Sequence, residues 1–81
     1  MAHYFFDTRD NDTFIEDDVG LEVSTLQGAR DIASKSLAEL ARDVLPGAAV
    51  RTLAVEVRDA VGPVLRAVLR FEVQQVREGM V

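Results

Sequence analysis

The last third of the chain alternates apolar and polar residues through two runs that flank one turn. In the first run, Leu53, Val55 and Val57 occupy every second position, and the alternation resumes after the turn. A period of two lets a strand bury one face and expose the other to water. The pattern therefore predicts an antiparallel β-hairpin with strands at about residues 52–59 and 64–74.

Asp59 and Gly62 lie in the turn of this hairpin. A left-handed conformation at Gly62 after a type I turn would give a three-residue loop with a bulge. That loop sets Glu56 opposite Arg66 on the solvent-facing side of the hairpin. An exposed pair of this kind contributes at most about 1 kcal/mol and mainly selects the register.

The amino-terminal third predicts a second, shorter hairpin. Its strands cover about residues 3–8 and 13–16, with a run of turn-forming residues, 10–12, between them. A further turn follows at Asp17 and Gly20, where glycine permits a positive φ. The chain then runs extended into a helix.

A helix is predicted over about residues 25–45. Ser24 and Gln27 have the spacing of a capping box at its start, and Pro46 with Gly47 ends it. Its apolar residues recur at steps of three and four, which gives one apolar stripe. The stripe comprises Leu26, Ala29, Ala33, Leu37, Leu40, Ala41 and Val44.

The element order is thus strand, strand, helix, strand, strand. It predicts a single α+β domain over residues 1–81, with ββαββ order and a four-stranded antiparallel sheet that packs the amphipathic helix on one face. The expected centre of the core is Val55, Val57, Leu69, Phe71, Leu37 and Leu40.

One helix leaves the other face of the sheet uncovered. An antiparallel sheet can expose one face to water, so this face has a purely structural explanation as well as a functional one. The functional explanation is a partner surface that is partly apolar and partly basic. Its candidate residues are Phe5, Val64, Arg66, Val68 and Arg70.

The chain has 81 residues and no cysteine, so core packing alone must stabilise one small domain. Because small domains are only marginally stable, this length favours a homodimer. The net charge of −5 is uneven: residues 1–23 carry −6 and residues 24–81 carry +1. Such an acidic amino-terminal hairpin makes nucleic acid an unlikely partner.

No catalytic, metal or cofactor site is predicted. His3 is the only histidine, and the acidic residues of the first hairpin lack the glycine and the alternating acids of a calcium loop. The chain has no secretory signal and no apolar run of membrane-spanning length. We therefore expect a cytoplasmic protein that is not an enzyme.

Three segments resemble a family of small uncharacterised bacterial proteins, a domain of unknown function common in rhizobia and their relatives. They are residues 4–7 (YFFD), residues 17–22 (DDVGLE) with the helix that follows, and residues 57–62 (VRDAVG). The resemblance covers about residues 3–73 and implies no activity. Pro63 departs from the pattern at the start of the last strand.

Two functions remain open from the sequence. The first is an interaction module that self-associates through the uncovered sheet face. The alternative is a regulatory binder, loosely similar to antitoxins, that acts on nucleic acid through its arginines or on a basic protein through its acidic hairpin.

Overall fold

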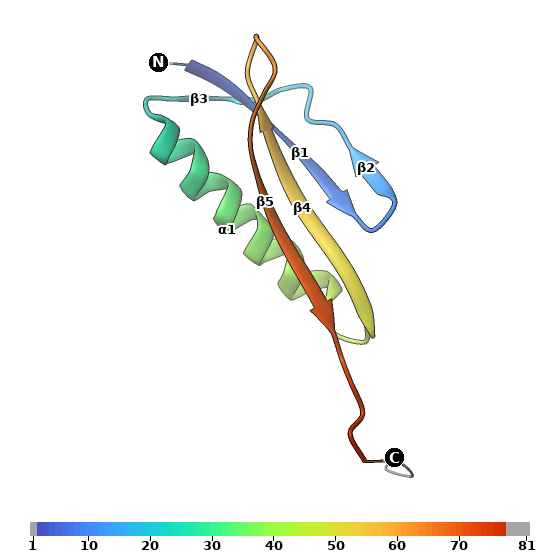
Figure 1. The fold of residues 1–81 in the computed structure, drawn as a ribbon. Helices are drawn as coiled ribbons and strands as arrows, with labels where there is room; N and C mark the ends of the chain where they lie inside the picture. Colours follow the sequence, from blue (N-terminus) through green and yellow to red (C-terminus); the bar gives the residue numbers. More distant parts are fainter. Residues whose placement is uncertain (1, 78–81) are drawn as a thin grey trace.

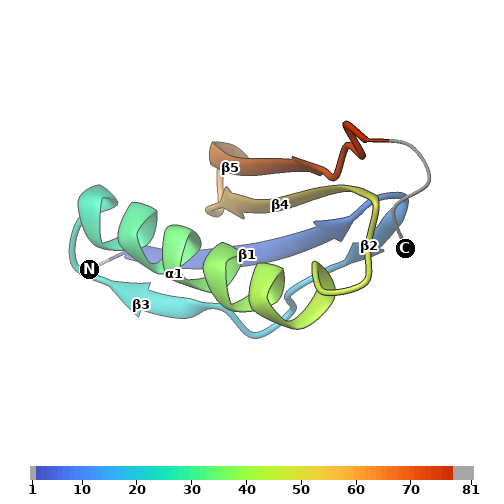
Figure 2. The same ribbon diagram turned by 90° about the horizontal axis from the view of Figure 1, so that it is seen from below.

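The computed structural model describes residues 2–77, and it is an α+β fold with one helix and one antiparallel sheet (Figure 1). The elements in chain order are β1 (Ala2–Asp10), β2 (Thr13–Ile15), β3 (Leu21–Val23), α1 (Leu26–Val44), β4 (Val50–Arg58) and β5 (Pro63–Glu72). The sheet order is β2-β1-β4-β5, and β3 also pairs with β1. The helix lies on one side of the strands (Figure 2).

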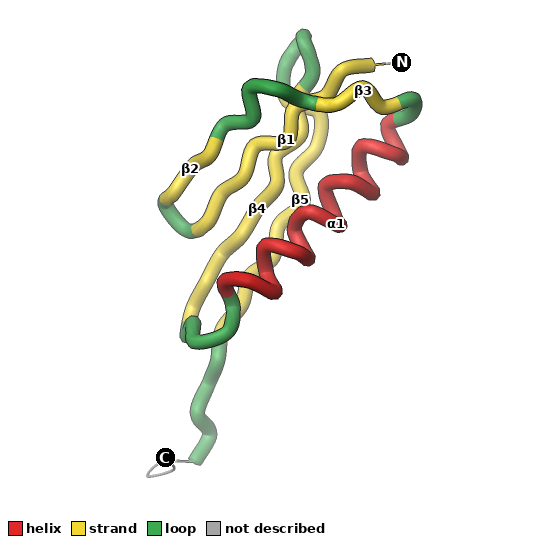
Figure 3. The backbone as a smooth tube through the Cα atoms, turned by 180° about the vertical axis from the view of Figure 1, so that it is seen from behind, coloured by secondary structure: helices red, strands yellow, loops and turns green. Residues whose placement is uncertain are grey.

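The prediction of four strands in ββαββ order is wrong, because residues 21–23 form a fifth strand. Ala2, His3 and Tyr4 pair with β3, whereas Thr8, Arg9 and Asp10 pair with β2. The two short strands thus lie one after the other along the same side of β1, joined by a connection that bends away (Figure 3). Three residues are too few to show an alternating pattern.

The carboxyl-terminal hairpin has the predicted register, with Glu56 opposite Arg66. The register shifts near the turn: Val57 pairs with Leu65 and Arg58 with Pro63, so Val64 is an extra residue on β5. In the turn, Asp59 Oδ1 accepts hydrogen bonds from the backbone N–H groups of residues 61 and 62, at 2.9 and 3.1 Å. Gly62 has a positive φ of +151°, a backbone conformation that glycine adopts more readily than other residues.

The helix begins at Leu26, one residue later than predicted. Thr25, not Ser24, is the N-cap, and its Oγ1 accepts a hydrogen bond from Gly28 N at 2.9 Å. Gln27 donates instead to Asp31 Oδ1 at 3.0 Å, so the predicted capping box does not form. Threonine and serine hydroxyls both satisfy a free N–H at a helix start, so the neighbouring Thr25 can serve as the cap.

The core lies between the first half of the helix and the sheet, and its fully buried strand residues come from β1, β3 and β4. Small residues allow this close approach: Ala29 and Ala33 have no exposed surface. The buried cluster is Tyr4, Val23, Ala29, Ala33, Val55 and Val57. Of the expected core centre, Val55 and Val57 are buried, whereas Leu69, Phe71, Leu37 and Leu40 are only half-buried. The core is therefore displaced from β5 toward β1.

Candidate interaction surface

A buried charge lies on the sheet face away from α1, here called the open face. Asp7 in β1 is only 5% exposed. Its Oδ2 accepts a hydrogen bond from Arg58 Nε at 2.9 Å, and its Oδ1 accepts one from Asp17 N, also at 2.9 Å. Arg58 also donates to the carbonyl oxygen of Asp17 at 2.8 Å. Because a buried carboxylate needs both a cation and hydrogen-bond donors, these contacts account for its burial.

Asp17 closes the gap that the bent connection between β2 and β3 leaves beside β1. Its Oδ2 accepts a hydrogen bond from Phe6 N at 3.1 Å, and its Oδ1 accepts from Val19 N and Gly20 N at 3.0 and 3.1 Å. Burial acts to raise the pKa of Asp17, but these three N–H donors and the charge of Arg58 outweigh it and lower the pKa. Gly20, also predicted as a turn residue, has a φ of +72°.

All three segments that carry the family resemblance meet at this point. Asp7 comes from the first segment, Asp17 and Gly20 from the second, and Arg58 from the third. Their contacts join β1, the β2–β3 connection and β4. These hydrogen bonds and the ion pair give each of the four residues a structural role.

Ion pairs join neighbouring strands of the sheet. Arg9 Nε lies 2.9 Å from Glu56 Oε2, and Arg66 Nε lies 3.2 Å from the same oxygen. Arg51 binds the Asp10 carboxylate through two nitrogens, at 2.6 and 2.7 Å, and this hydrogen bonding lowers the pKa of Asp10. Two acids of the first hairpin, Asp7 and Asp10, are thus paired with arginines of β4.

Two arginines of the open face also stack on aromatic rings. The guanidinium of Arg58 lies 4.4 Å from the ring centre of Phe5, and that of Arg9 lies 4.5 Å from that of Phe14. The sequence reasoning missed Phe14. Arg9 and Phe14 are equally far from the two-residue turn at residues 11–12, and this spacing, which puts them directly opposite, was the available signal.

The structure divides the five predicted surface residues. Phe5 is half-buried beneath Arg58, and Val64 is half-buried and packs against the core cluster. Arg66, Val68 and Arg70 are exposed on β5. The accessible part of the predicted surface is therefore β5, the edge strand.

The outer side of β5 has backbone groups that no strand of the chain pairs. Val73 N donates to Ala49 O at 2.8 Å, so residue 73 faces β4, and by alternation so do residues 71, 69, 67 and 65. The N–H and C=O groups of residues 66, 68, 70 and 72 therefore point away from the sheet. Since β5 ends the sheet order, they form a free edge.

A family model for a domain of unknown function, DUF6894, matches residues 3–72. The chain belongs to this family. The match confirms the resemblance to an uncharacterised domain family, while the bacterial and rhizobial distribution stays a prediction. No significant match was found among curated proteins or solved structures.

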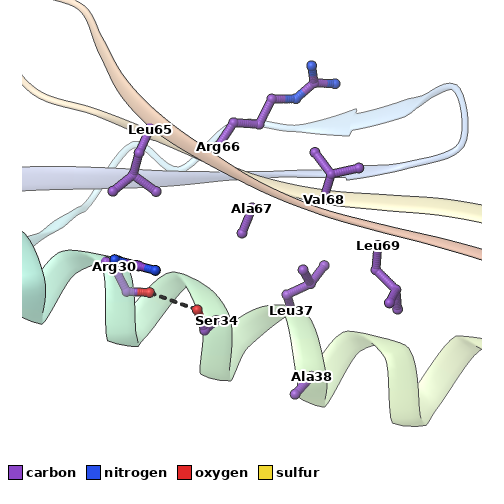
Figure 4. A pocket seen from close by; sticks show the side chains of 9 residues that line it. All are labelled: Arg30, Ser34, Leu37, Ala38, Leu65, Arg66, Ala67, Val68 and Leu69. Carbon is purple, nitrogen blue, oxygen red and sulfur yellow. Dashed lines mark hydrogen bonds between the residues drawn. The ribbon is translucent and has the colours of Figure 1, made fainter.

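Two hollows flank β5 of this DUF6894 domain. One lies between β5 and α1, where Leu65, Ala67 and Leu69 face Ser34 and Leu37 (Figure 4). The other lies on the open face, and its lining includes Asp7, Arg58 and Arg66.

Within residues 2–77 of the DUF6894 domain, no three His, Asp or Glu side chains are grouped as metal ligands. His3 lies at the edge formed by β3, with Nε2 2.9 Å from Val19 O and Nδ1 3.3 Å from Glu22 Oε1. The helix that the structure describes is not apolar enough to cross a membrane.

Proposed function

We propose that this domain is a non-enzymatic interaction module that self-associates through the open face where it meets β5. The observation that carries the proposal is the free edge of β5, a strand of ten residues whose exposed side chains include Arg66, Val68 and Arg70. A long edge strand with unpaired backbone groups readily accepts another strand. A cytoplasmic location, and a further protein partner, belong to the same proposal.

The solution mass tests this function directly. One chain has a mass of 8.9 kDa. Light scattering of the whole chain at tens of micromolar is expected to give twice this mass. A monomer throughout that range would contradict self-association. Because charged side chains border the edge, added salt should weaken the association if opposite charges hold it together.

A regulatory binder of nucleic acid is the second candidate, and the stacked pairs Arg58–Phe5 and Arg9–Phe14 favour it. Sheets that bind single-stranded nucleic acid use aromatic rings and arginines in this way. However, Asp7 and Glu56 neutralise these arginines, which disfavours a polyanion. The double variant Arg66→Ala/Arg70→Ala should abolish any oligonucleotide binding, and unchanged affinity would reject this candidate.

A basic protein partner for the acidic hairpin, the other form of this alternative, receives less support. Asp7 and Asp10 are already bound to Arg58 and Arg51. A cationic partner would have to displace those arginines or use the remaining exposed acids.

A further inference from the structure

We propose that the partner at β5 is a second copy of this chain, paired antiparallel so that Leu69 of one copy lies opposite Leu69 of the other. This inference rests on the proposed self-association and adds the strand, the orientation and the register. The sheet would continue across the pair, with both α1 helices on the same face, because a two-fold axis perpendicular to the sheet preserves its faces.

The direction of the backbone groups limits the choice of register. Outward backbone groups must meet outward groups, so residues 66, 68, 70 and 72 of one copy must lie opposite even-numbered residues of the other. The two-fold axis then passes through residue 67, 68 or 69 when the central part of β5 is paired.

Charge selects among these three registers. An axis at residue 68 sets Arg66 opposite Arg70 twice, and directly opposed like charges destabilise a sheet. An axis at residue 67 sets both arginines opposite valines. Only the axis at residue 69 sets Arg66 opposite Glu72, and the symmetry makes this pair twice.

The charges concerned are not fully satisfied within one chain. Glu56 is shared by Arg9 and Arg66, so two guanidinium groups face a single carboxylate. Among residues 2–77, Glu72 forms no ion pair; its Oε2 accepts a hydrogen bond from Gln74 at 3.0 Å. The second copy supplies the missing carboxylate for Arg66.

The same register pairs apolar residues on the helix side of the sheet. Leu69 meets Leu69, Ala67 meets Phe71, and Leu65 meets Val73. Val73 is 59% exposed in the single chain, and Leu65, Ala67 and Leu69 line the hollow beside α1. Pairing therefore covers apolar surface that the single helix leaves accessible.

Two single charge reversals test the register. Glu72→Arg opposes arginine to arginine in its own dimer, and Arg66→Glu opposes glutamate to glutamate. Each variant alone should dimerise at least about tenfold more weakly than the unchanged chain. An equimolar mixture should recover dimers, because each copy then meets the opposite charge.

Light scattering at low salt gives the readout, with circular dichroism to show that both variants are folded. Arg70→Glu is the matched control, since Arg70 lies opposite Val68 in this register and gains no opposite charge from either variant. Recovery in the mixture supports the inference. If the unchanged chain dimerises and the mixture does not recover, the register is wrong while self-association stands; a monomeric unchanged chain overturns both.

Cysteine substitution gives an independent readout, because the chain contains no cysteine. Residue 69 forms a non-hydrogen-bonded pair with itself, at a Cα separation of about 4.5 Å, which falls within the range of disulfides. Under mild oxidation Leu69→Cys should give a covalent dimer, whereas Ala67→Cys should not. Cross-linking at residue 67 in place of residue 69 would overturn the register.

Discussion

The two edges of the sheet meet solvent in opposite ways. Along one side of β1, the pairing is divided between two strands of three residues each, and Asp17 fills the gap between them. At the other side, β5 continues for ten residues with its outer backbone groups unpaired. The first edge offers no continuous row of donors and acceptors to another chain, and the second does.

The difference shows where the domain can recognise a partner. Short strands, bulges and bends are the devices by which soluble proteins protect sheet edges. Here two short strands and the bend between them form the β2–β3 edge, whereas β5 has its proline only at the first position and its bulge at the turn. Protection of one edge leaves β5 as the available site for strand addition.

Proline substitutions in β5 give the largest expected effect and test which groups point outward. Ala67→Pro removes an N–H that faces β4, and it should lower the free energy of unfolding by about 3 kcal/mol. Val68→Pro removes an N–H that points away from the sheet, a loss that edge strands tolerate. It should lower the free energy of unfolding by less than about 1 kcal/mol. Urea unfolding at the lowest usable protein concentration separates this effect from dimer dissociation.

Equal losses for the two proline variants would contradict the assigned orientation. Circular dichroism spectra of Val68→Pro in dilute buffer should show the same secondary-structure content as the unchanged chain. The same variant should also fail to dimerise, because its backbone can no longer donate to a second copy.

Gly20→Ala should have the next largest effect on the free energy of unfolding, and it tests the packing at the β2–β3 edge. A Cβ at residue 20 would lie 2.5 Å from His3 Nε2 and 2.7 Å from Tyr4 O, at a φ of +72°. We expect a loss of about 2 kcal/mol from strain and displacement of the backbone. Gly47→Ala is the matched control, because φ there is +87° but nothing lies within 4 Å of the added atom.

For Gly47→Ala the strain alone should lower the free energy of unfolding by about 1 kcal/mol. Thermal unfolding followed by circular dichroism measures both variants. A Gly20→Ala chain as stable as the Gly47→Ala chain would show that His3 and Tyr4 do not pack closely against Gly20.

Asp17→Asn should have a smaller effect, and one that depends on pH. The amide can accept the bonds from Val19 N and Gly20 N, but its NH₂ would then face the N–H of Phe6. We expect a loss of about 1 kcal/mol at neutral pH. Because the pKa of Asp17 is lowered in the folded chain, its contribution is present above the unfolded pKa and is lost as pH falls through the folded pKa.

Urea midpoints measured between pH 5 and pH 2 should therefore fall more steeply for the unchanged chain than for Asp17→Asn. Asp10 remains in both chains, and its lowered pKa gives both a residual slope of the same sign. Parallel curves would show that Asp17 does not contribute to acid sensitivity.

The sequence predicts those elements whose pattern is local. Alternation about the turn at residues 59–62 predicts the hairpin and the pairing of Glu56 with Arg66, and three- and four-residue steps predict the helix. Asp17 is recognisable as a turn residue. Its bond to Phe6 N is not predictable, because it depends on where two short strands separate beside β1.

The neighbour relation between β1 and β4 explains what the charge pattern of the sequence did not show. The sequence shows an acidic amino-terminal hairpin followed by a nearly neutral remainder, but not which charges meet. In the fold β1 and β4 are adjacent strands, so Arg58 meets Asp7 and Arg51 meets Asp10 within one chain. The order of strands in a sheet is a long-range property that alternation does not contain.

His3 should give the smallest effect, and it concerns the β3 edge. Its two ring nitrogens face acceptors, Val19 O and Glu22 Oε1, so only the doubly protonated ring can donate to both. The Val19 carbonyl oxygen first, and then Glu22, raise the pKa of His3 above its ordinary value of 6.5. The resulting stability is present below the unfolded pKa and is lost as pH rises through the folded pKa.

Since His3 is the only histidine, an NMR titration of its imidazole follows this edge alone. We expect the unchanged chain to titrate above 6.5. Glu22→Gln should lower the pKa only in part, because the larger cause is the backbone carbonyl of Val19, which the substitution leaves in place. An imidazole that titrates at or below 6.5 would show that the connection before β3 does not hold the Val19 carbonyl against His3. The β2–β3 edge would then be more open to a partner strand than its contacts indicate.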